Sequence, residues 1–261
     1  DLMSSVIREI KAKSILTPQG VGALSGGYDF TLNPYAGCAF ACSYCYVPKF
    51  PNKDHRQEEW GSWVNVKMNA PELLQRDRLK IFGSRIFFSS ATDPYQYIEL
   101  KYRLTRRCLQ ALKNYQPAKL TMHTRSHLIL QDIELLKSFG SKLKVGISLT
   151  TDDDDVRKEF EPFAPSIKRR LELASELKSH GVKVYGSLAP LLPCDPDRLA
   201  ELIRPYMDTI WIDEMRWREV NNRPHLIEKY KDFFDEKNHA AVRARIASLF
   251  EHEETYEEQL A

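Results

Sequence analysis

Three of the five cysteines in this 261-residue chain lie within eight positions, at Cys38, Cys42 and Cys45. Their spacing, C-x3-C-x2-C, differs from the ferredoxin runs, which supply more than three cysteines. Three thiolates hold three irons of a [4Fe–4S] cube and leave the fourth iron without a protein ligand. An open iron is a place where a cofactor or substrate can bind the metal directly. The motif therefore predicts iron–sulfur chemistry with a ligand at the free iron.

A zinc site is the alternative for these thiols, with a distant fourth ligand such as His55. Structural zinc sites usually pair one two-ligand knuckle with a second. Here Cys108 and Cys194 stand alone and supply no second cysteine knuckle. A third alternative is three thiols that lie close together with no metal. The spacing favours the cluster over both.

Composition is typical of a soluble globular protein, with 43% hydrophobic and 28% charged residues and a net charge of +2. No apolar run approaches the roughly 18 residues of a membrane span, and the first residues lack the apolar part of a secretory signal. We expect a cytoplasmic protein with no membrane partner. An odd number of cysteines then indicates free thiols or metal ligands rather than disulfides. Residues 49–125 hold fifteen Lys and Arg against seven Asp and Glu, which leaves a basic, anion-binding face open.

Apolar runs alternate with amphipathic helical patterns, which predicts right-handed βαβ units and a parallel sheet. The expected buried strands are 85–90, 119–124, 144–150, 183–192 and 209–215. The expected helices are 104–115, 128–140, 166–181 and 195–207, of which the second and third end at Gly140 and Gly181, residues suited to a left-handed C′ position. The fold class is therefore α/β, with about six units in an open or partial barrel.

The ends of the chain differ from this pattern. Residues 1–30 predict an N-terminal extension of irregular structure or a hairpin, because they are rich in Gly and turn formers. Residues 221–261 predict a charged helical segment with no strand pattern. The main domain is then expected at residues 31–220.

Several segments together resemble the spore photoproduct lyase-like branch of the radical S-adenosylmethionine (SAM) proteins. The resemblance covers about residues 30–215 and is carried, in order, by "NPYAGCAFACSYCYVP", "FFSSATDPYQYIE", "LTRRCLQAL", "HTRSHLILQDIELL", "VGISLTT", "EFEPFAPSIKRRLE" and "LAPLLP". It implies a partial (β/α)6 TIM-like barrel in which the cysteine loop follows the first strand. The chemistry then occurs at the C-terminal ends of the strands, as in complete barrels.

The resemblance also implies cofactors and a reaction. Cys38, Cys42 and Cys45 would hold a [4Fe–4S] cluster, and the amine and carboxylate of SAM would chelate the open iron. An electron from a reductant such as flavodoxin or ferredoxin would then cleave SAM to methionine and a 5′-deoxyadenosyl radical, which abstracts hydrogen from the substrate.

The same resemblance implies a set of cofactor contacts. Ser148 would lie near the ribose or carboxylate of SAM. Arg125 stands where the branch commonly has lysine and would pair with the methionyl carboxylate, although the two cations are not equivalent. The remaining implied contacts are Ser90, Thr92 and Asp93 on the methionyl side, Leu188 and Ala189 at the adenine, and Tyr44 and Tyr46 beside the cluster. Strand capping, turn chemistry and loop packing are the structural alternatives for these residues.

One feature of the branch is missing. Spore photoproduct lyase carries a hydrogen-donating cysteine in the segment that corresponds to "SSATD", where this chain has Ser90 and Ala91. A serine O–H bond is too strong for that role, so we do not expect reversal of the spore photoproduct. Cys194, just past a predicted strand end, is the candidate catalytic donor, and a small buried hydrophobe is its alternative role. Asp213, Glu214 and Arg216 could bind substrate at the mouth of the barrel.

Two classes of function follow. The first is a radical SAM enzyme of lyase-like type acting on an unidentified substrate, either a nucleic acid or nucleotide, or a small metabolite or peptide. The second is a non-catalytic protein with a structural metal cluster, which either binds nucleic acid with strong salt dependence or senses redox state.

Overall fold

The structure is a computed structural model that describes residues 5–20, 27–49, 58–213, 223–250 and 252–253. Its larger sheet has the strand order β11-β10-β9-β8-β7-β6-β3-β2. Neighbouring strands are parallel from β3 to β11, and β2 is antiparallel to β3. The strands are β2 (Leu16–Pro18), β3 (Phe30–Leu32), β6 (Arg85–Phe88), β7 (Lys119–Thr124), β8 (Leu143–Ser148), β9 (Lys183–Leu188), β10 (Thr209–Ile212) and β11 (His252–Glu253).

This sheet is an open barrel, because its edge strands β2 and β11 do not pair with each other among the described residues. The strands β6, β7, β8, β9 and β10 are the five predicted ones, and β3, which was not predicted, is the sixth parallel strand of the barrel. The predicted α/β partial barrel is thus confirmed.

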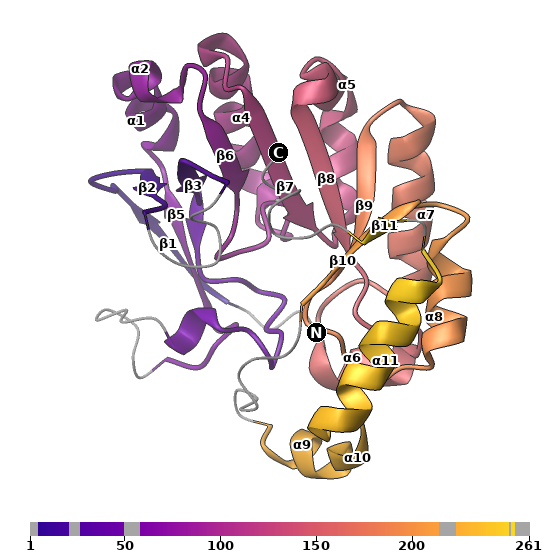
Figure 1. The fold of residues 1–261 in the computed structure, drawn as a ribbon. Helices are drawn as coiled ribbons and strands as arrows, with labels where there is room; N and C mark the ends of the chain where they lie inside the picture. Colours follow the sequence, from indigo (N-terminus) through magenta and orange to yellow (C-terminus); the bar gives the residue numbers. More distant parts are fainter. Residues whose placement is uncertain (1–4, 21–26, 50–57, 214–222, 251, 254–261) are drawn as a thin grey trace.

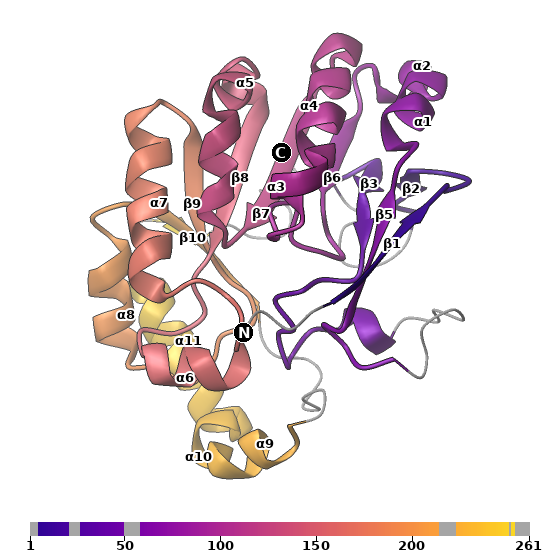
Figure 2. The same ribbon diagram turned by 180° about the vertical axis from the view of Figure 1, so that it is seen from behind.

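Helices cover the outer face of the sheet, as the two opposite views in Figures 1 and 2 show. They include α1 (Ala70–Arg76), α2 (Arg78–Ile81), α3 (Glu99–Tyr102), α4 (Leu104–Tyr115), α5 (Ile133–Lys137), α7 (Ile167–Ser179) and α8 (Pro196–Ile203). Alternate strand residues such as Ile86, Leu120, Val145 and Ile210 are fully buried in the core beneath them. Because side chains alternate along a strand, the intervening residues face the inside of the barrel.

The predicted strands are all present, and the helices 104–115, 166–181 and 195–207 are found within a few residues of their expected bounds. The single helix predicted over 128–140 was wrong. A 3-10 helix, His127–Asp132, comes first, and α5 follows it. The carboxylate of Asp132 is buried and binds Tyr95 and Arg106, which fixes the backbone at the junction. Gly140 and Gly181 have φ of +57° and +77°, as their predicted left-handed positions require.

A second, three-stranded sheet was not predicted. Its order is β1-β5-β4, with β1 (Val6–Ile10) parallel and β4 (Tyr35–Ala36) antiparallel to β5 (Trp63–Lys67). Strand β4 leads directly into the cysteine loop. The described part of the N-terminal extension therefore belongs to both sheets, through β1 and β2, and it helps to hold the start of the loop.

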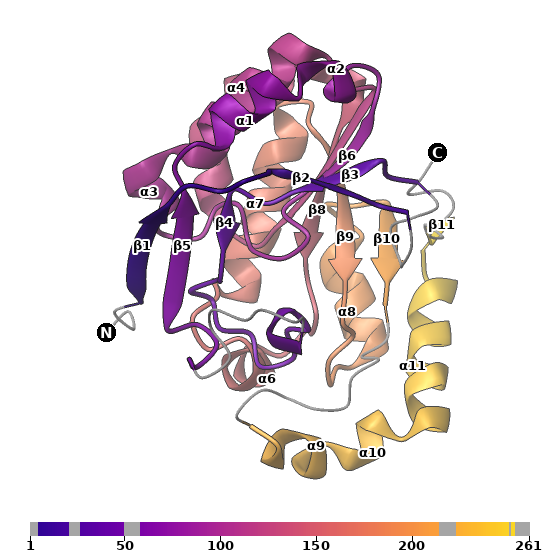
Figure 3. The same ribbon diagram turned by 90° about the vertical axis from the view of Figure 1, so that its left-hand side faces the viewer.

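The C-terminal segment is helical as predicted, with α9 (His225–Lys229), α10 (Lys231–Phe234) and α11 (Glu236–Ser248). The expectation of no strand there was wrong, because β11 pairs with β10. Leu226 and Phe234 pack against Phe160 of α6 (Asp154–Phe160). These helices and α6 lie at the end toward which the strand arrowheads point (Figures 1 and 3). The division at residues 30 and 220 stays a prediction.

Within the described part of the chain, no helix combines the length and apolar character needed to cross a bilayer.

Candidate active site

The cysteine loop is a compact turn structure between β4 and the 3-10 helix Val47–Lys49. The Ala41 N–H donates to the Cys38 carbonyl at 3.2 Å, and the Cys45 N–H donates to the Cys42 carbonyl at 3.1 Å. The three cysteines share a hydrophobic cluster with Phe40 and two tryptophans, Trp60 and Trp63. The chain thus turns twice in eight residues, which brings its three thiols next to these aromatic side chains.

Two residues after β6 hold this loop at the C-terminal edge of the sheet. The Thr92 hydroxyl donates to the Gly37 carbonyl at 2.7 Å. The Gln96 side chain accepts from the Ala39 N–H at 2.9 Å and donates to the Gly37 carbonyl at 3.2 Å. Thr92 was predicted to contact SAM, and its observed bonds are to the loop and to Gln96. Gln96 was not predicted, because a lone glutamine carries no spacing signal.

Gly37 is required where the loop leaves β4. Its φ is +83°, and an added Cβ would lie 2.4 Å from the Trp63 carbonyl oxygen. We expect Gly37→Ala to destabilise the protein by about 2–4 kcal/mol, since a left-handed residue with a Cβ costs about 1–2 kcal/mol before any clash. Urea unfolding monitored by circular dichroism measures this. Gly140→Ala is the matched control, because its φ is +57° and its surroundings are open; equal losses in both variants would contradict the packing account.

Arg125, directly after β7, lies beside the loop. Its Nη1 donates to the Cys42 Sγ at 3.1 Å and to the Tyr44 hydroxyl oxygen at 2.8 Å. The buried carboxylate of Asp93 accepts from the Arg125 backbone N–H at 3.0 Å and from the Thr124 hydroxyl at 2.7 Å. Burial raises the pKa of Asp93, while these donors and Arg125 oppose the rise. Asp93 thus fixes the strand end that presents Arg125.

Glu161 connects this region to α7 and was given no role by the sequence. Its carboxylate accepts from the Tyr44 hydroxyl at 2.5 Å, from the Thr150 hydroxyl at 2.8 Å and from Arg170. It also lies 3.1 Å from Arg125 Nη1. Burial opposes ionisation, but the two guanidinium groups outweigh it and lower the Glu161 pKa to about 2. Glu161 is therefore a buried anion between two cations.

Two serines lie near the C-terminal ends of neighbouring strands on the inner face. Ser148 of β8 is paired in register with Ser187 of β9, and the Ser148 carbonyl accepts from Arg170 at 3.1 Å. The Ser187 hydroxyl is buried and has no hydrogen-bond partner among the described residues. Sequence reasoning found Ser148 and missed Ser187. An unpaired buried hydroxyl at a strand end is a ready contact for a ligand.

The other predicted cofactor contacts lie around this edge. Leu188 ends β9, and its carbonyl accepts from the Asp213 N–H. Ala189 follows it and forms a cis peptide bond with Pro190. The Tyr46 hydroxyl donates to the Ser90 carbonyl, which ties the far end of the cysteine loop to the segment after β6. His55, Glu214 and Arg216 lie outside the described residues.

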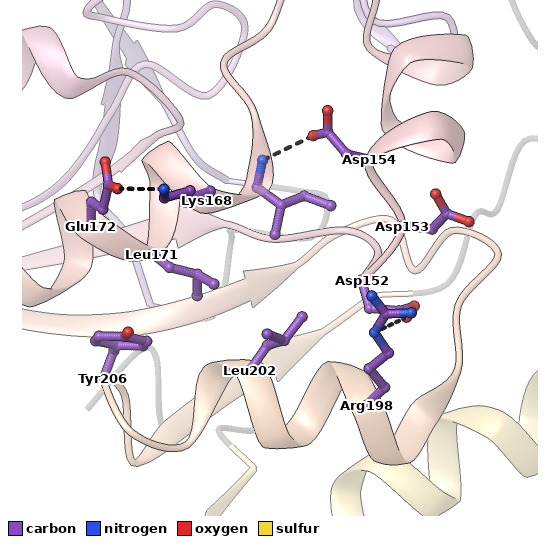
Figure 4. Close-up of a pocket in the computed structure, with 10 residues that line it drawn as sticks. Asp152, Asp153, Asp154, Lys168, Leu171, Glu172, Arg198, Leu202 and Tyr206 are labelled. Atoms are coloured by element: carbon purple, nitrogen blue, oxygen red, sulfur yellow. Dashed lines mark hydrogen bonds and ion pairs between the residues drawn. The ribbon is translucent and has the colours of Figure 1, made fainter.

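Cys194 lies in the loop between β9 and α8, partly buried against the main core. Burial and the nearby carboxylate of Asp152 raise its pKa. Asp152 lines a surface pocket of about 510 Å³ that lies between α7, α8 and the start of α6 (Figure 4). The predicted site residues do not line this pocket, whose other charged lining residues are Asp153, Asp154, Lys168, Glu172 and Arg198. Cys108 is fully buried in α4.

An aromatic layer crosses the inner face below Arg125. The His123 ring contacts Phe87, Tyr185 and Trp211 with centroid distances of 4.9, 5.5 and 5.5 Å, and its Nε2 is hydrogen-bonded to the Tyr185 hydroxyl. Strand alternation places four cations on the same face, one step toward the strand starts: Arg85, Lys119, Lys144 and Lys183. The inner face is therefore aromatic and basic.

His123 makes stability depend on pH. Burial, with the nearby charges of Arg125 and Lys144, lowers its pKa to about 3. The unfolded histidine binds a proton below about pH 6.5 and the folded one does not, so stability falls as the pH decreases. We expect a loss of about 1–2 kcal/mol between pH 7 and pH 5, at most 1.4 kcal/mol per pH unit. His123→Gln, which cannot titrate, should lack this part of the loss in urea titrations; identical pH profiles would contradict the assignment.

The donor set suits an iron–sulfur cluster. Three thiols of one loop are soft ligands, and they lie close enough that Cys42 affects the pKa of Cys38 and of Cys45. Burial is the main cause that raises the Cys38 pKa, to about 12. Among the described residues no group of three His, Cys, Asp or Glu side chains forms a compact site for a single metal ion. A cube, which offers each thiolate its own iron, requires wider spacing than one ion does.

Three thiols in one loop at the C-terminal edge of a partial parallel barrel are the arrangement expected of an enzyme with an open iron–sulfur site. The sequence profile of the radical SAM superfamily matches residues 32–204. The chain belongs to the radical SAM superfamily, and it is a radical SAM enzyme. The family implies an iron–sulfur cluster and SAM. The non-catalytic alternatives are set aside.

A related sequence illustrates the relationship. The chain is 31% identical to an uncharacterised protein of Methanocaldococcus jannaschii over 225 residues, covering 85% of this chain and 83% of that protein. It spans between 50% and 83% of the length of the first five curated relatives that it matches.

Solved structures share the fold. A cysteine-to-serine mutant of spore photoproduct lyase has a TM-score of 0.67 at 14% identity, over 95% of this chain and 80% of that chain. Another mutant, with bound AdoMet and dinucleoside spore photoproduct, has a TM-score of 0.59 at 16% identity over 87% and 75%. Streptococcus suis SuiB bound to the precursor peptide SuiA has a TM-score of 0.53 at 17% identity over 79% and 46%. The expected likeness to spore photoproduct lyase is thus confirmed for the fold.

Proposed function

We propose that this enzyme cleaves SAM reductively at a [4Fe–4S] cluster held by Cys38, Cys42 and Cys45. When bound, the cluster and SAM supply a 5′-deoxyadenosyl radical, which abstracts a hydrogen atom from an organic substrate. The observation that carries the proposal is the loop itself: three thiols, docked by Thr92 and Gln96 at the C-terminal edge of the barrel. A small reductant such as flavodoxin or ferredoxin would supply the electron.

Arg125 and the strand ends are proposed to bind SAM. Arg125 Nη1 is bonded within the loop, whereas its Nη2 has no partner among the described residues and can donate to the methionyl carboxylate. Ser148, together with the unpaired hydroxyl of Ser187, is suited to the ribose. The Leu188 carbonyl already accepts a hydrogen bond from the Asp213 N–H. The Ala189 backbone is therefore the better candidate for a hydrogen bond to the adenine.

The remaining predicted contacts are proposed to position the site. Thr92 holds the start of the cysteine loop, and Asp93 holds the backbone of Arg125. Tyr44 bridges Arg125 and Glu161, while Tyr46 and the Ser90 carbonyl close the far end of the loop. These residues act through the cysteine loop and the guanidinium rather than through a direct contact with SAM.

For the substrate, the inner face favours a ring-bearing anion such as a nucleotide or a nucleic-acid component. The rings of His123 and Trp211 offer stacking surfaces, and Lys119, Lys144 and Lys183 attract negative charge. The fourth cation, Arg85, is already paired with Asp29. The spore photoproduct lyase structure with a bound dinucleoside supports this class. A peptide is the second candidate, supported by the peptide-bound structure of SuiB. A small metabolite remains the third alternative from the sequence.

The proposed cleavage is tested with anaerobically reconstituted enzyme, SAM and dithionite. We expect 5′-deoxyadenosine to form in amounts that exceed the enzyme, and to be absent when dithionite is omitted. Chromatography with mass spectrometry measures it. A preparation with a full [4Fe–4S] content that forms no 5′-deoxyadenosine above the control would contradict the proposal. Deuterated candidate substrates then identify the substrate by deuterium transfer into the product.

A further inference from the structure

The Cys42 thiol has a cationic partner. Arg125 Nη1 lies 3.1 Å from its sulfur, and the same nitrogen donates to the Tyr44 hydroxyl. Arg125 is largely buried, with a side-chain exposure of 14%. A hydrogen bond from a charged donor is stronger than one from a neutral donor, and burial strengthens it further. The Cys42 side of the loop therefore carries a fixed positive charge.

Glu161 holds that charge from the opposite side. Its Oε1 lies 3.1 Å from Arg125 Nη1 and accepts from Tyr44, and its Oε2 accepts from Arg170. Glu161 and Arg170 are both fully buried. Arg170 is itself held by the carbonyls of Pro165 and Ser148. The chain of contacts from α7 to the cysteine loop thus has no exposed member that could relax freely.

An arginine side chain that is not held samples several rotamers, so confining it costs conformational entropy. Asp93 binds the backbone N–H of Arg125, but its carboxylate is 3.9 Å from Nε and does not fix the guanidinium plane. Glu161 and Tyr44 supply that restraint. Without Glu161, the guanidinium is free to turn toward Asp93 and away from the Cys42 sulfur.

We propose that Glu161 is a positioning residue, which holds the Arg125 guanidinium against the Cys42 sulfur and thereby raises the reduction potential of the bound cluster. Reduction adds negative charge to a cluster, and a hydrogen-bonded cation at a ligand sulfur stabilises the reduced form. The inference rests on the proposed function, because it requires Cys42 to be a cluster ligand.

A double-mutant cycle tests the proposal. The four proteins are wild type, Arg125→Met, Glu161→Gln and the double variant, each reconstituted and titrated anaerobically without SAM, with the reduced cluster measured by EPR. We expect Arg125→Met to lower the reduced-to-oxidised ratio at a fixed potential about tenfold, which is 59 mV for one electron. In the Glu161→Gln background the same change should have less than about a twofold effect. The cycle separates this coupling from the direct effect of the Glu161 charge.

Glu134→Gln is the matched control, because Glu134 is an exposed residue of α5 paired only with Lys137 among the described residues. It should leave the Arg125 effect unchanged. Should Glu161→Gln fail to fold, Tyr44→Phe replaces it, since it removes the hydroxyl between Arg125 and Glu161; the Arg125 effect should then fall by at least half.

An equal Arg125 effect in both backgrounds would overturn the positioning role of Glu161. No effect of Arg125→Met in either background would overturn the link between the guanidinium and the cluster. Failure of the proposed function is distinguishable from both results. A wild type that takes up no [4Fe–4S] cluster gives no EPR signal to titrate, and one that holds the cluster without cleaving SAM still gives the potentials of all four proteins.

Discussion

Alanine at Cys38, Cys42 or Cys45 is expected to reduce 5′-deoxyadenosine formation at least about 1000-fold, equal to about 4 kcal/mol of activation free energy. The reason is that two thiolates of the loop cannot hold a cube that needs three protein ligands. Iron and sulfide content should fall in parallel in each variant. Anaerobic turnover with SAM and dithionite, normalised to protein, measures the effect.

The two other cysteines are the matched controls. Cys108 is fully buried in α4, and Cys194 lies in the loop before α8. Cys108→Ala and Cys194→Ala should keep the cluster and the cleavage of SAM. If Cys194 is the hydrogen donor, its variant should still form 5′-deoxyadenosine but change the product made from the substrate. A loop variant with normal cleavage, or a control variant without a cluster, would contradict the assignment of the ligands.

Glu161→Ala is expected to destabilise the protein by about 3–5 kcal/mol, because it leaves two guanidinium groups buried without their shared carboxylate. Arg170 has no exposure, and its partner Glu161 has none either. Urea unfolding of the apo-protein measures the loss. Glu134→Ala, at an exposed ion pair on α5, should change stability by less than about 0.5 kcal/mol.

The stabilisation that Glu161 provides also depends on pH. The pKa of Glu161 is lowered to about 2 in the folded protein, against about 4.3 for an ordinary glutamate. Its contribution is therefore fully present above about pH 5 and is lost as the pH falls toward 2. Glu161→Ala should lack this acid-dependent loss. A variant as stable as wild type, with the same acid profile, would contradict the role of Glu161 as a buried anion.

The barrel strands β6 to β10 could be predicted from the sequence because each is a short apolar run that is buried on the helix-covered side. The strands β1, β5 and β11 could not. Strand β5 pairs with residues 57 positions earlier, and β11 consists of two residues beside β10. Such strands form because tertiary packing brings distant segments together, and local propensity carries little of that information.

The candidate site, like the fold, could be predicted from the sequence only in part. The cysteine loop is visible in the sequence because its three cysteines lie within eight residues. Glu161 is 117 positions from Tyr44, with which it shares a hydrogen bond, and no spacing rule connects them. Arg125 was expected at the SAM carboxylate, and the structure adds a bond to Cys42 that its position after β7 does not reveal. Buried polar networks of this kind are visible only in the folded arrangement.

The central claim is that three cysteines leave one iron open for SAM. EPR spectroscopy of the dithionite-reduced, reconstituted enzyme before and after addition of SAM tests it most directly. We expect the signal of a reduced [4Fe–4S] cluster whose g-values change when SAM is added. Adenosine, which lacks the methionyl amine and carboxylate, should leave them unchanged. A cluster spectrum that SAM leaves unaltered, or a protein that binds only zinc, would contradict it.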